Sequence, residues 1–203
     1  MKTLIQSFAA VAAFTTVALA EPLTFDFKDP KGVNNVVFKT DAPLEAISGS
    51  ASGVSGKVTF DPANPGATKG KIVIDTKSMT VPNKMMNEHM HSPMWMDVAK
   101  HPEIAFEVKE LKNVKTTGND TTAQATGTFS MRGVTKDLTV PIKLTYLKDK
   151  AAARMPNSNG DLLVVRANFQ VKRSDFNINP GSGTDKVADE IDLSLSVAGI
   201  SPK

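Results

Sequence analysis

The chain has 203 residues, of which 40% are hydrophobic and 22% are charged. This balance is typical of a globular protein and excludes a disordered, collagen-like or multi-span membrane chain. Cysteine is absent, which excludes disulfide scaffolds, cysteine-ligated metal centres and thiol nucleophiles. The formal net charge is only +3 and the basic residues are scattered, so we expect no nucleic acid partner.

Residues 1-20 have the pattern of a secretory signal peptide. A basic residue at the start precedes an apolar stretch at 8-19, which ends in the A-x-A cleavage site Ala18-Leu19-Ala20. The apolar stretch is shorter than the ~20 residues that a membrane-spanning helix needs. We therefore expect cleavage after this site, export to the periplasm without stable membrane insertion, and a single domain over residues 21-203.

Alternation of apolar and polar residues dominates the rest of the chain. In its clearest instance Ile191, Leu193, Leu195 and Val197 are separated by polar residues, as in a strand with one buried and one wet face. Roughly eight or nine such strands, separated by turn-rich segments, are typical of a barrel or a sandwich. The predicted strands are Leu23–Lys28, Val33–Thr40, Val54–Asp61, Gly70–Asp75, Ile104–Lys112, Thr121–Met131, 134-147, Leu163–Val171 and Ile191–Val197.

Two short segments between these strands have turn chemistry. Arg132-Gly133 predicts a two-residue hairpin, because glycine at the second loop position allows a positive φ. The Gly/Ser-rich stretch Ser48–Gly53 predicts a loop or a bulged strand.

Alternation is interrupted only over Pro82–His101, where β-branched residues are few and good helix formers are many. Ser92-Pro93 has the pattern of a helix start, since serine caps free N–H groups and proline is tolerated at the first helical position. We expect one short helix before Ser92 and another over Pro93–Ala99, ended by Pro102.

The same segment concentrates five of the nine methionines, the single tryptophan and all three histidines. Three interpretations remain open: core packing by flexible thioethers, an adaptable wall of a lipid pocket, and a thioether/imidazole copper site. The second is compatible with the first. The ligands of the third would be Met90, His89, His91 and Met94.

Signatures of catalysis are missing from the sequence. It contains no G-x-S-x-G elbow, no H-E-x-x-H motif and no glycine-rich phosphate loop after a strand. We expect neither enzymatic activity nor a cofactor. Arg173 and Asp175 are a charged pair at a corner where a strand ends. Two interpretations of this pair remain open: a structural role in the corner, and contact with the headgroup of a ligand.

The chain resembles the YceI family of secreted, lipocalin-like barrel proteins. Five segments carry the resemblance, in order and at matching distances: Gly56–Asp61, Asn87–Phe106, Gly127–Lys136, Arg173–Phe176 and Val187–Ile191. The resemblance implies an extended antiparallel β-barrel of about eight strands with short capping helices around 83-100, open at one end and enclosing a hydrophobic cavity. Family members are associated with polyisoprenoids, isoprenoid quinones or other long amphiphiles, without known catalysis.

From these observations we expect a non-catalytic periplasmic protein that holds such a lipid inside the barrel, for transport or storage. The alternative is a periplasmic copper- or haem-handling protein that uses the Met/His-rich segment 85-101. An edge strand or the methionine-rich segment offers a surface for a homodimer. The candidate ligand-binding residues, chosen as large apolar members of the inward-facing sets, are Phe60, Met94, Trp95, Phe106, Phe129, Leu144, Tyr146, Phe169 and Leu193.

Overall fold

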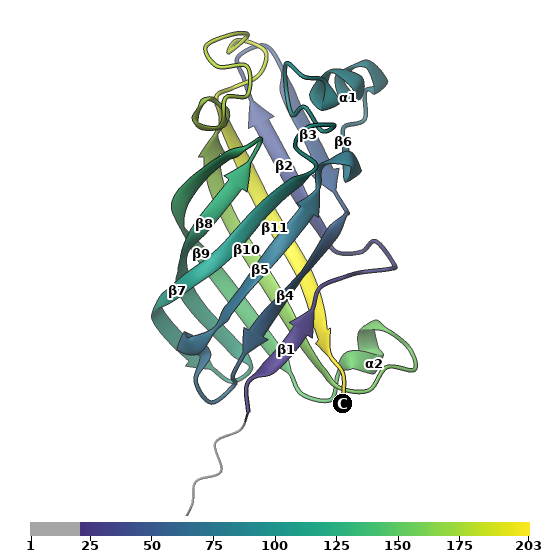
Figure 1. Ribbon diagram of the computed structural model, residues 1–203, viewed down its shortest axis with the longest axis vertical. Coiled ribbons are helices and arrows are strands. Elements are labelled where there is room, and N and C mark those ends of the chain that lie inside the picture. Colours follow the sequence, from purple (N-terminus) through teal and green to yellow (C-terminus); the bar gives the residue numbers. More distant parts are fainter. Residues whose placement is uncertain (1–20) are drawn as a thin grey trace, which may run out of the picture.

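The computed structural model describes residues 21-203, so the predicted signal peptide lies outside the described residues. Eight antiparallel strands form a closed barrel in the order β1-β4-β5-β7-β8-β9-β10-β11, with β11 pairing back to β1 (Figure 1). This confirms the mainly β barrel expected from the alternation and the resemblance. The barrel strands are β1 Leu23–Asp26, β4 Val54–Phe60, β5 Lys69–Asp75, β7 Glu103–Thr117, β8 Asp120–Met131, β9 Val134–Leu147, β10 Asp161–Lys172 and β11 Glu190–Ser201.

Three further strands extend the sheet beyond β11. They are β2 Asn35–Asp41, β3 Ala46–Ala51 and the two-residue β6 Met79–Thr80. One long strand, β11, pairs with β2 along Asp192–Ser196 and with β1 only at Ile200. The β2-β3-β6 sheet thus continues the wall at the end of β11 that β1 does not reach.

The glycine- and serine-rich stretch is a regular strand at its start, not the loop or bulged strand that its composition predicts. Gly49 pairs with Phe38 across β2 and β3. A Cβ atom at Gly49 would lie 2.2 Å from Phe38 Cζ and 2.4 Å from the Thr80 carbonyl oxygen. The glycine is therefore required by close packing between paired strands, which composition alone does not reveal.

The predicted hairpin between β8 and β9 is confirmed. Met131 pairs with Val134, and the loop residues Arg132 and Gly133 have φ angles of +49° and +76°. Two positive φ angles are typical of the type I′ turn that matches the twist of antiparallel strands.

One of the two predicted helices is present. The helix α1, Lys84–His91, begins after Asn83, whose side chain accepts a hydrogen bond from the backbone N–H of Met86. The helix predicted over Pro93–Ala99 is wrong, and the chain forms turns there. Backbone N–H groups of these turns donate hydrogen bonds back to α1, as Met96 N–H does to the Met90 carbonyl. Asp97 has a φ of +47°. This pattern cannot propagate a helix.

The two ends of the barrel are built differently. At one end lie α1 and the loop between β10 and β11, residues 177-189, at the top of Figure 1. At the other end lie β1, the chain terminus and α2, Ala151–Arg154. Both ends therefore carry a short helix, but only the α1 end carries the long 177-189 loop, and only the other end carries β1 and the C-terminus.

Candidate functional site

An apolar cavity of about 430 Å³ occupies the interior of the barrel. Its walls are the inward-facing residues of the alternating strands, joined by α1 and the turns after it. Leu193 and Leu195 point into this space and stay only partly buried although their strand is central in the sheet. The barrel interior is therefore not packed solid, and its volume lies in the range of small-molecule binding sites.

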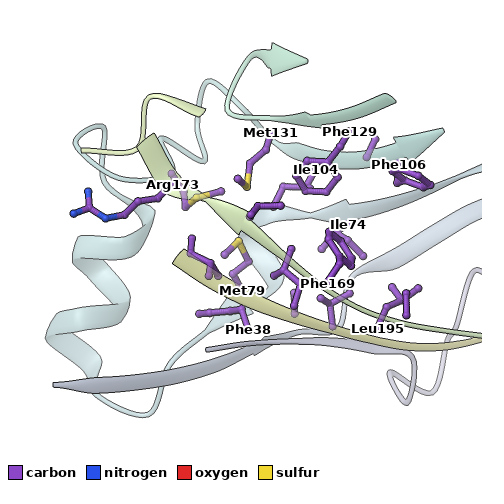
Figure 2. Close-up of a pocket in the computed structure, with 18 of the residues that line it drawn as sticks. Phe38, Ile74, Met79, Ile104, Phe106, Phe129, Met131, Phe169, Arg173 and Leu195 are labelled. Carbon is purple, nitrogen blue, oxygen red and sulfur yellow. The ribbon is translucent and has the colours of Figure 1, made fainter. Parts of the chain in front are cut away.

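Most of the cavity wall could be read from the alternation, and six of the nine candidate residues lie in it. Figure 2 shows how side chains from facing strands converge, Phe106 and Phe129 from one side and Phe169 and Leu195 from another. The six candidates in the wall are Trp95, Phe106, Phe129, Leu144, Phe169 and Leu193. Wall residues that the candidate set missed include Phe38, Ile74, Met79, Ile104 and Met131.

Two candidates, Phe60 and Tyr146, lie beyond the cavity rather than in its wall. With Phe25 they form a cluster that we call the aromatic plug, in which the ring centroids are 5.8 to 6.4 Å apart. Edge-to-face and tilted contacts of this kind add to the apolar burial of the rings. The plug fills the end of the barrel away from α1 and so sets the depth of the cavity.

Met94 is the third candidate that does not line the cavity. Its side chain is 65% exposed. It lies in the turns that form in place of the predicted second helix, and those turns direct its side chain to solvent.

The cavity meets solvent at the end that carries α1. Of all the residues in its wall, four are exposed, and we call this set the mouth: Met86, His89, Gly183 and Lys186. Two come from α1 and two from the 177-189 loop. Glu45 also reaches the cavity from the β2-β3 turn, where Leu44 N–H bonds the Asp185 carbonyl at 2.9 Å. The titratable side chains His89, Lys186 and Glu45 therefore gather at one end of an otherwise apolar space.

Arg173 lies in the cavity wall, and its guanidinium supports the 177-189 loop. Its side chain is fully buried and donates hydrogen bonds to the carbonyls of Ile178, Asn179, Ser182, Val187 and Ala188. In Figure 2 its guanidinium is directed away from the apolar side chains around the cavity. Its guanidinium carbon lies 5.6 Å from the centroid of the Trp95 ring, a cation–π contact. These contacts favour the structural interpretation of the corner.

The rest of that corner is also structural. Ser174 donates hydrogen bonds from its N–H and its hydroxyl to Asp189, at 2.9 and 2.7 Å. Burial alone would raise the pKa of Asp189, but these bonds and the nearby Arg173 charge outweigh it and lower the pKa. Asp175 lies on the outer surface, 2.6 Å from Lys136 Nζ. Asn177 ends the corner with a φ of +57°.

The Met/His segment is divided between several environments. Met90 and His89 line the cavity, whereas His91 Nε2 lies 2.8 Å from the Met79 carbonyl oxygen. Within residues 21-203, no cluster of three or more histidine, aspartate or glutamate side chains is placed to hold a metal ion. Part of the segment thus lines the cavity, a position that is compatible with the first two interpretations of its methionines.

The part of the chain that the structure describes also contains no helix with the length and apolar character needed to cross a bilayer.

Together the fold and the cavity define an eight-stranded antiparallel barrel with an apolar interior and one open end. Residues 29-198 match the YceI-like domain family. The chain is 32% identical over 157 residues to a UPF0312 protein of Yersinia pestis (strain Pestoides F), covering 77% of this chain and 75% of that protein. A UPF0312 protein of Enterobacter sp. (strain 638) is 31% identical with the same coverage. The chain therefore belongs to the YceI-like family, as the sequence motifs predicted.

Solved structures show the same fold. Burkholderia cenocepacia BcnA matches with a TM-score of 0.66 at 23% identity, covering 81% of this chain and 95% of that one. A polyisoprenoid binding domain from Saccharophagus degradans, implicated in plant cell wall breakdown, matches with a TM-score of 0.64 at 12% identity. That match covers 90% of this chain and 100% of the other.

Proposed function

We propose that this protein is a non-catalytic carrier that holds the chain of a long amphiphile inside the barrel. The ligand is a polyisoprenoid, an isoprenoid quinone or a similar lipid, held for transport or storage in the periplasm. The observation that carries the proposal is the apolar cavity whose exposed wall residues all lie at one end. The relationship to a polyisoprenoid binding domain supports the same ligand class.

The physical basis of binding is burial of the apolar chain. Burying ~300 Å² of chain at ~25 cal/mol/Å² contributes roughly 7 kcal/mol before the cost of association. Affinity then needs no special polar contact inside the barrel, where the wall is almost entirely hydrocarbon. Selection among ligands rests on the length and shape of the chain.

The orientation of the ligand follows from the asymmetry of the cavity. The polar headgroup remains at the mouth, near His89, Lys186 and Glu45, because an unpaired polar group inside the barrel would lose its hydration. The apolar end of the chain then points toward the aromatic plug.

Trp95 is the single tryptophan of the chain and lines the cavity, so its fluorescence reports occupancy directly. As a probe we use geranylgeraniol, a prenol whose headgroup is a single hydroxyl. We expect it to change this fluorescence until one molecule is bound per protein. The double variant Leu193→Phe/Leu195→Phe narrows the cavity and should weaken binding about tenfold or more. The matched control Ser194→Phe places the same ring on the outer face of β11 and should bind like the unchanged protein. Equal binding by both variants would overturn the proposed site.

A further inference from the structure

The methionines around the cavity differ widely in exposure. Met79, Met96 and Met131 line it and are buried, with 8%, 5% and 5% of their surface exposed. Met90 also lines it and is partly buried. Met86 lines it as well but is 36% exposed, and among the exposed large hydrophobic residues of the described chain it alone belongs to the wall.

This position results from the geometry of α1. Met86 and Met90 are four residues apart and therefore lie on one face of the helix, the face that covers the cavity. Met86 is in the first turn, near solvent, and Met90 is in the last turn, packed against the core. Met85 is 65% exposed and does not line the cavity. Of the two adjacent exposed methionines, Met86 thus belongs to the cavity wall and Met85 does not.

Exposure controls the chemistry of methionine toward oxidants. A peroxide oxygen is transferred to the thioether: an S–O bond forms, the O–O bond breaks, and the departing oxygen leaves as water. Sulfur loses two electrons and hydrogen peroxide gains them. The product is a sulfoxide, which is polar where the thioether was apolar.

We propose that Met86 is an oxidation site that regulates occupancy of the barrel, with a peroxide as the oxidant. The proposal rests on the proposed function, because its effect is on the binding of an apolar chain. A sulfoxide at Met86 places an S=O group in the wall where the ligand enters. An apolar chain packed there removes water from that group without replacing its hydrogen bonds, so the oxidised protein binds the chain more weakly.

The first part of the test is independent of any ligand. The intact protein is treated with graded hydrogen peroxide, and each methionine is then followed by peptide mass spectrometry as the gain of one oxygen atom. We expect Met85, Met94 and Met86 to be oxidised first, while Met79, Met96 and Met131 stay protected. Oxidation of the buried cavity methionines as fast as Met86 would contradict the proposal.

The second part measures binding of geranylgeraniol through Trp95 fluorescence, before and after peroxide. In the Met85→Leu/Met94→Leu variant, Met86 is the only exposed methionine among residues 21-203, and we expect an affinity loss of roughly tenfold after peroxide. Incubation with methionine sulfoxide reductases and a dithiol, which supplies the two electrons that return the sulfoxide to the thioether, should restore the affinity. The matched variant Met86→Leu, with Met85 and Met94 intact, should have the same affinity before and after treatment.

The outcomes separate the two proposals. If the untreated protein does not bind geranylgeraniol or other amphiphiles, the proposed function fails and the regulatory inference fails with it. If the untreated protein binds but oxidation of Met86 leaves its affinity unchanged, only the regulatory inference is overturned. Equal loss of affinity in Met86→Leu would also overturn it, by assigning the effect to another residue.

Discussion

The hydroxyl of Tyr146 donates a hydrogen bond of 2.7 Å to Oδ2 of Asp161, across β9 and β10 at the plugged end of the barrel. The other carboxylate oxygen accepts a bond from Asp149 N–H at 2.8 Å and lies 3.2 Å from Lys203 Nζ. The ring of Tyr146 packs on Phe25 and Phe60 at the same time. One side chain therefore seals the cavity with its ring and satisfies a buried charge with its hydroxyl.

The variant Tyr146→Phe separates these two roles. It keeps the ring and removes a hydrogen bond to a buried carboxylate, so we expect the free energy of unfolding to fall by about 1–3 kcal/mol. Urea unfolding followed by circular dichroism measures this loss. Binding of geranylgeraniol should be retained, because the ring stays in the plug. Lost binding with unchanged stability would contradict these two roles, closure of the cavity by the ring and stabilisation of Asp161 by the hydroxyl.

Acid should destabilise the protein through its buried carboxylates. Burial alone would raise the pKa of Asp161, but the bonds from Asp149, Tyr146 and Lys203 outweigh it and lower the pKa below the usual 3.8. A group with a lowered folded-state pKa stabilises the fold above its unfolded pKa, and this contribution is lost as pH falls through the folded value.

Asp29 should act in the same direction. Its carboxylate pairs with Arg154 at 2.8 Å and accepts three backbone N–H bonds, which together lower its pKa despite its burial. We expect the urea midpoint to be nearly constant above about pH 5 and to decline below pH 4. The decline should be shallower in Asp29→Asn, which is less stable at neutral pH. An equally steep decline in that variant would show that other groups control acid unfolding.

Arg173 should be necessary for the order of the 177-189 loop. Lysine preserves the charge in Arg173→Lys but cannot reach the five carbonyls that the guanidinium bonds, so we expect a loss of at least ~3 kcal/mol in unfolding free energy. Amide hydrogen exchange over 178-189 should accelerate more than exchange in β8. The control Arg166→Lys changes an exposed arginine of β10 and should leave both quantities unchanged.

The aromatic plug should determine which chain lengths fit. Phe60→Leu removes part of the plug and deepens the cavity, so the preference within a series of prenols should shift toward longer chains. Phe27→Leu is the matched control, because Phe27 is fully buried but does not line the cavity, and its ring is not one of the three that form the plug. Both variants lose stability through smaller side chains, but only Phe60→Leu should change the length profile. An identical shift in both would disprove the role of the plug.

The alternation predicted the eight barrel strands and β2, with their inward faces, because burial on one side of a pleated sheet imposes a period of two. It could not predict depth along the barrel. Phe60, Tyr146 and Leu144 all belong to the inward sets, yet only Leu144 lies beside the cavity, since the other two rings meet each other at the barrel end. Depth depends on strand register around the barrel, which is a property of paired strands and not of one segment.

Segments without a period were the least predictable. Met94 lies in turns whose N–H groups bond back to α1, so its exposure follows from tertiary contacts. The two residues of β6 are too few for any pattern, and Gly49 is explained by the Phe38 ring and the Thr80 carbonyl oxygen, which come from the two neighbouring strands. The hairpin at Arg132-Gly133 was predictable because its positive φ angles are a local requirement.

Whether the barrel holds a lipid in the cell can be decided by native mass spectrometry of the protein purified from its own cells, followed by solvent extraction of any bound molecule. We expect one lipid per barrel, with mass increments of isoprene units or methylene groups, and its loss in Leu193→Phe/Leu195→Phe but not in Ser194→Phe. An empty protein that also rejects added prenols, quinones and fatty acids would show that the barrel is not a lipid carrier.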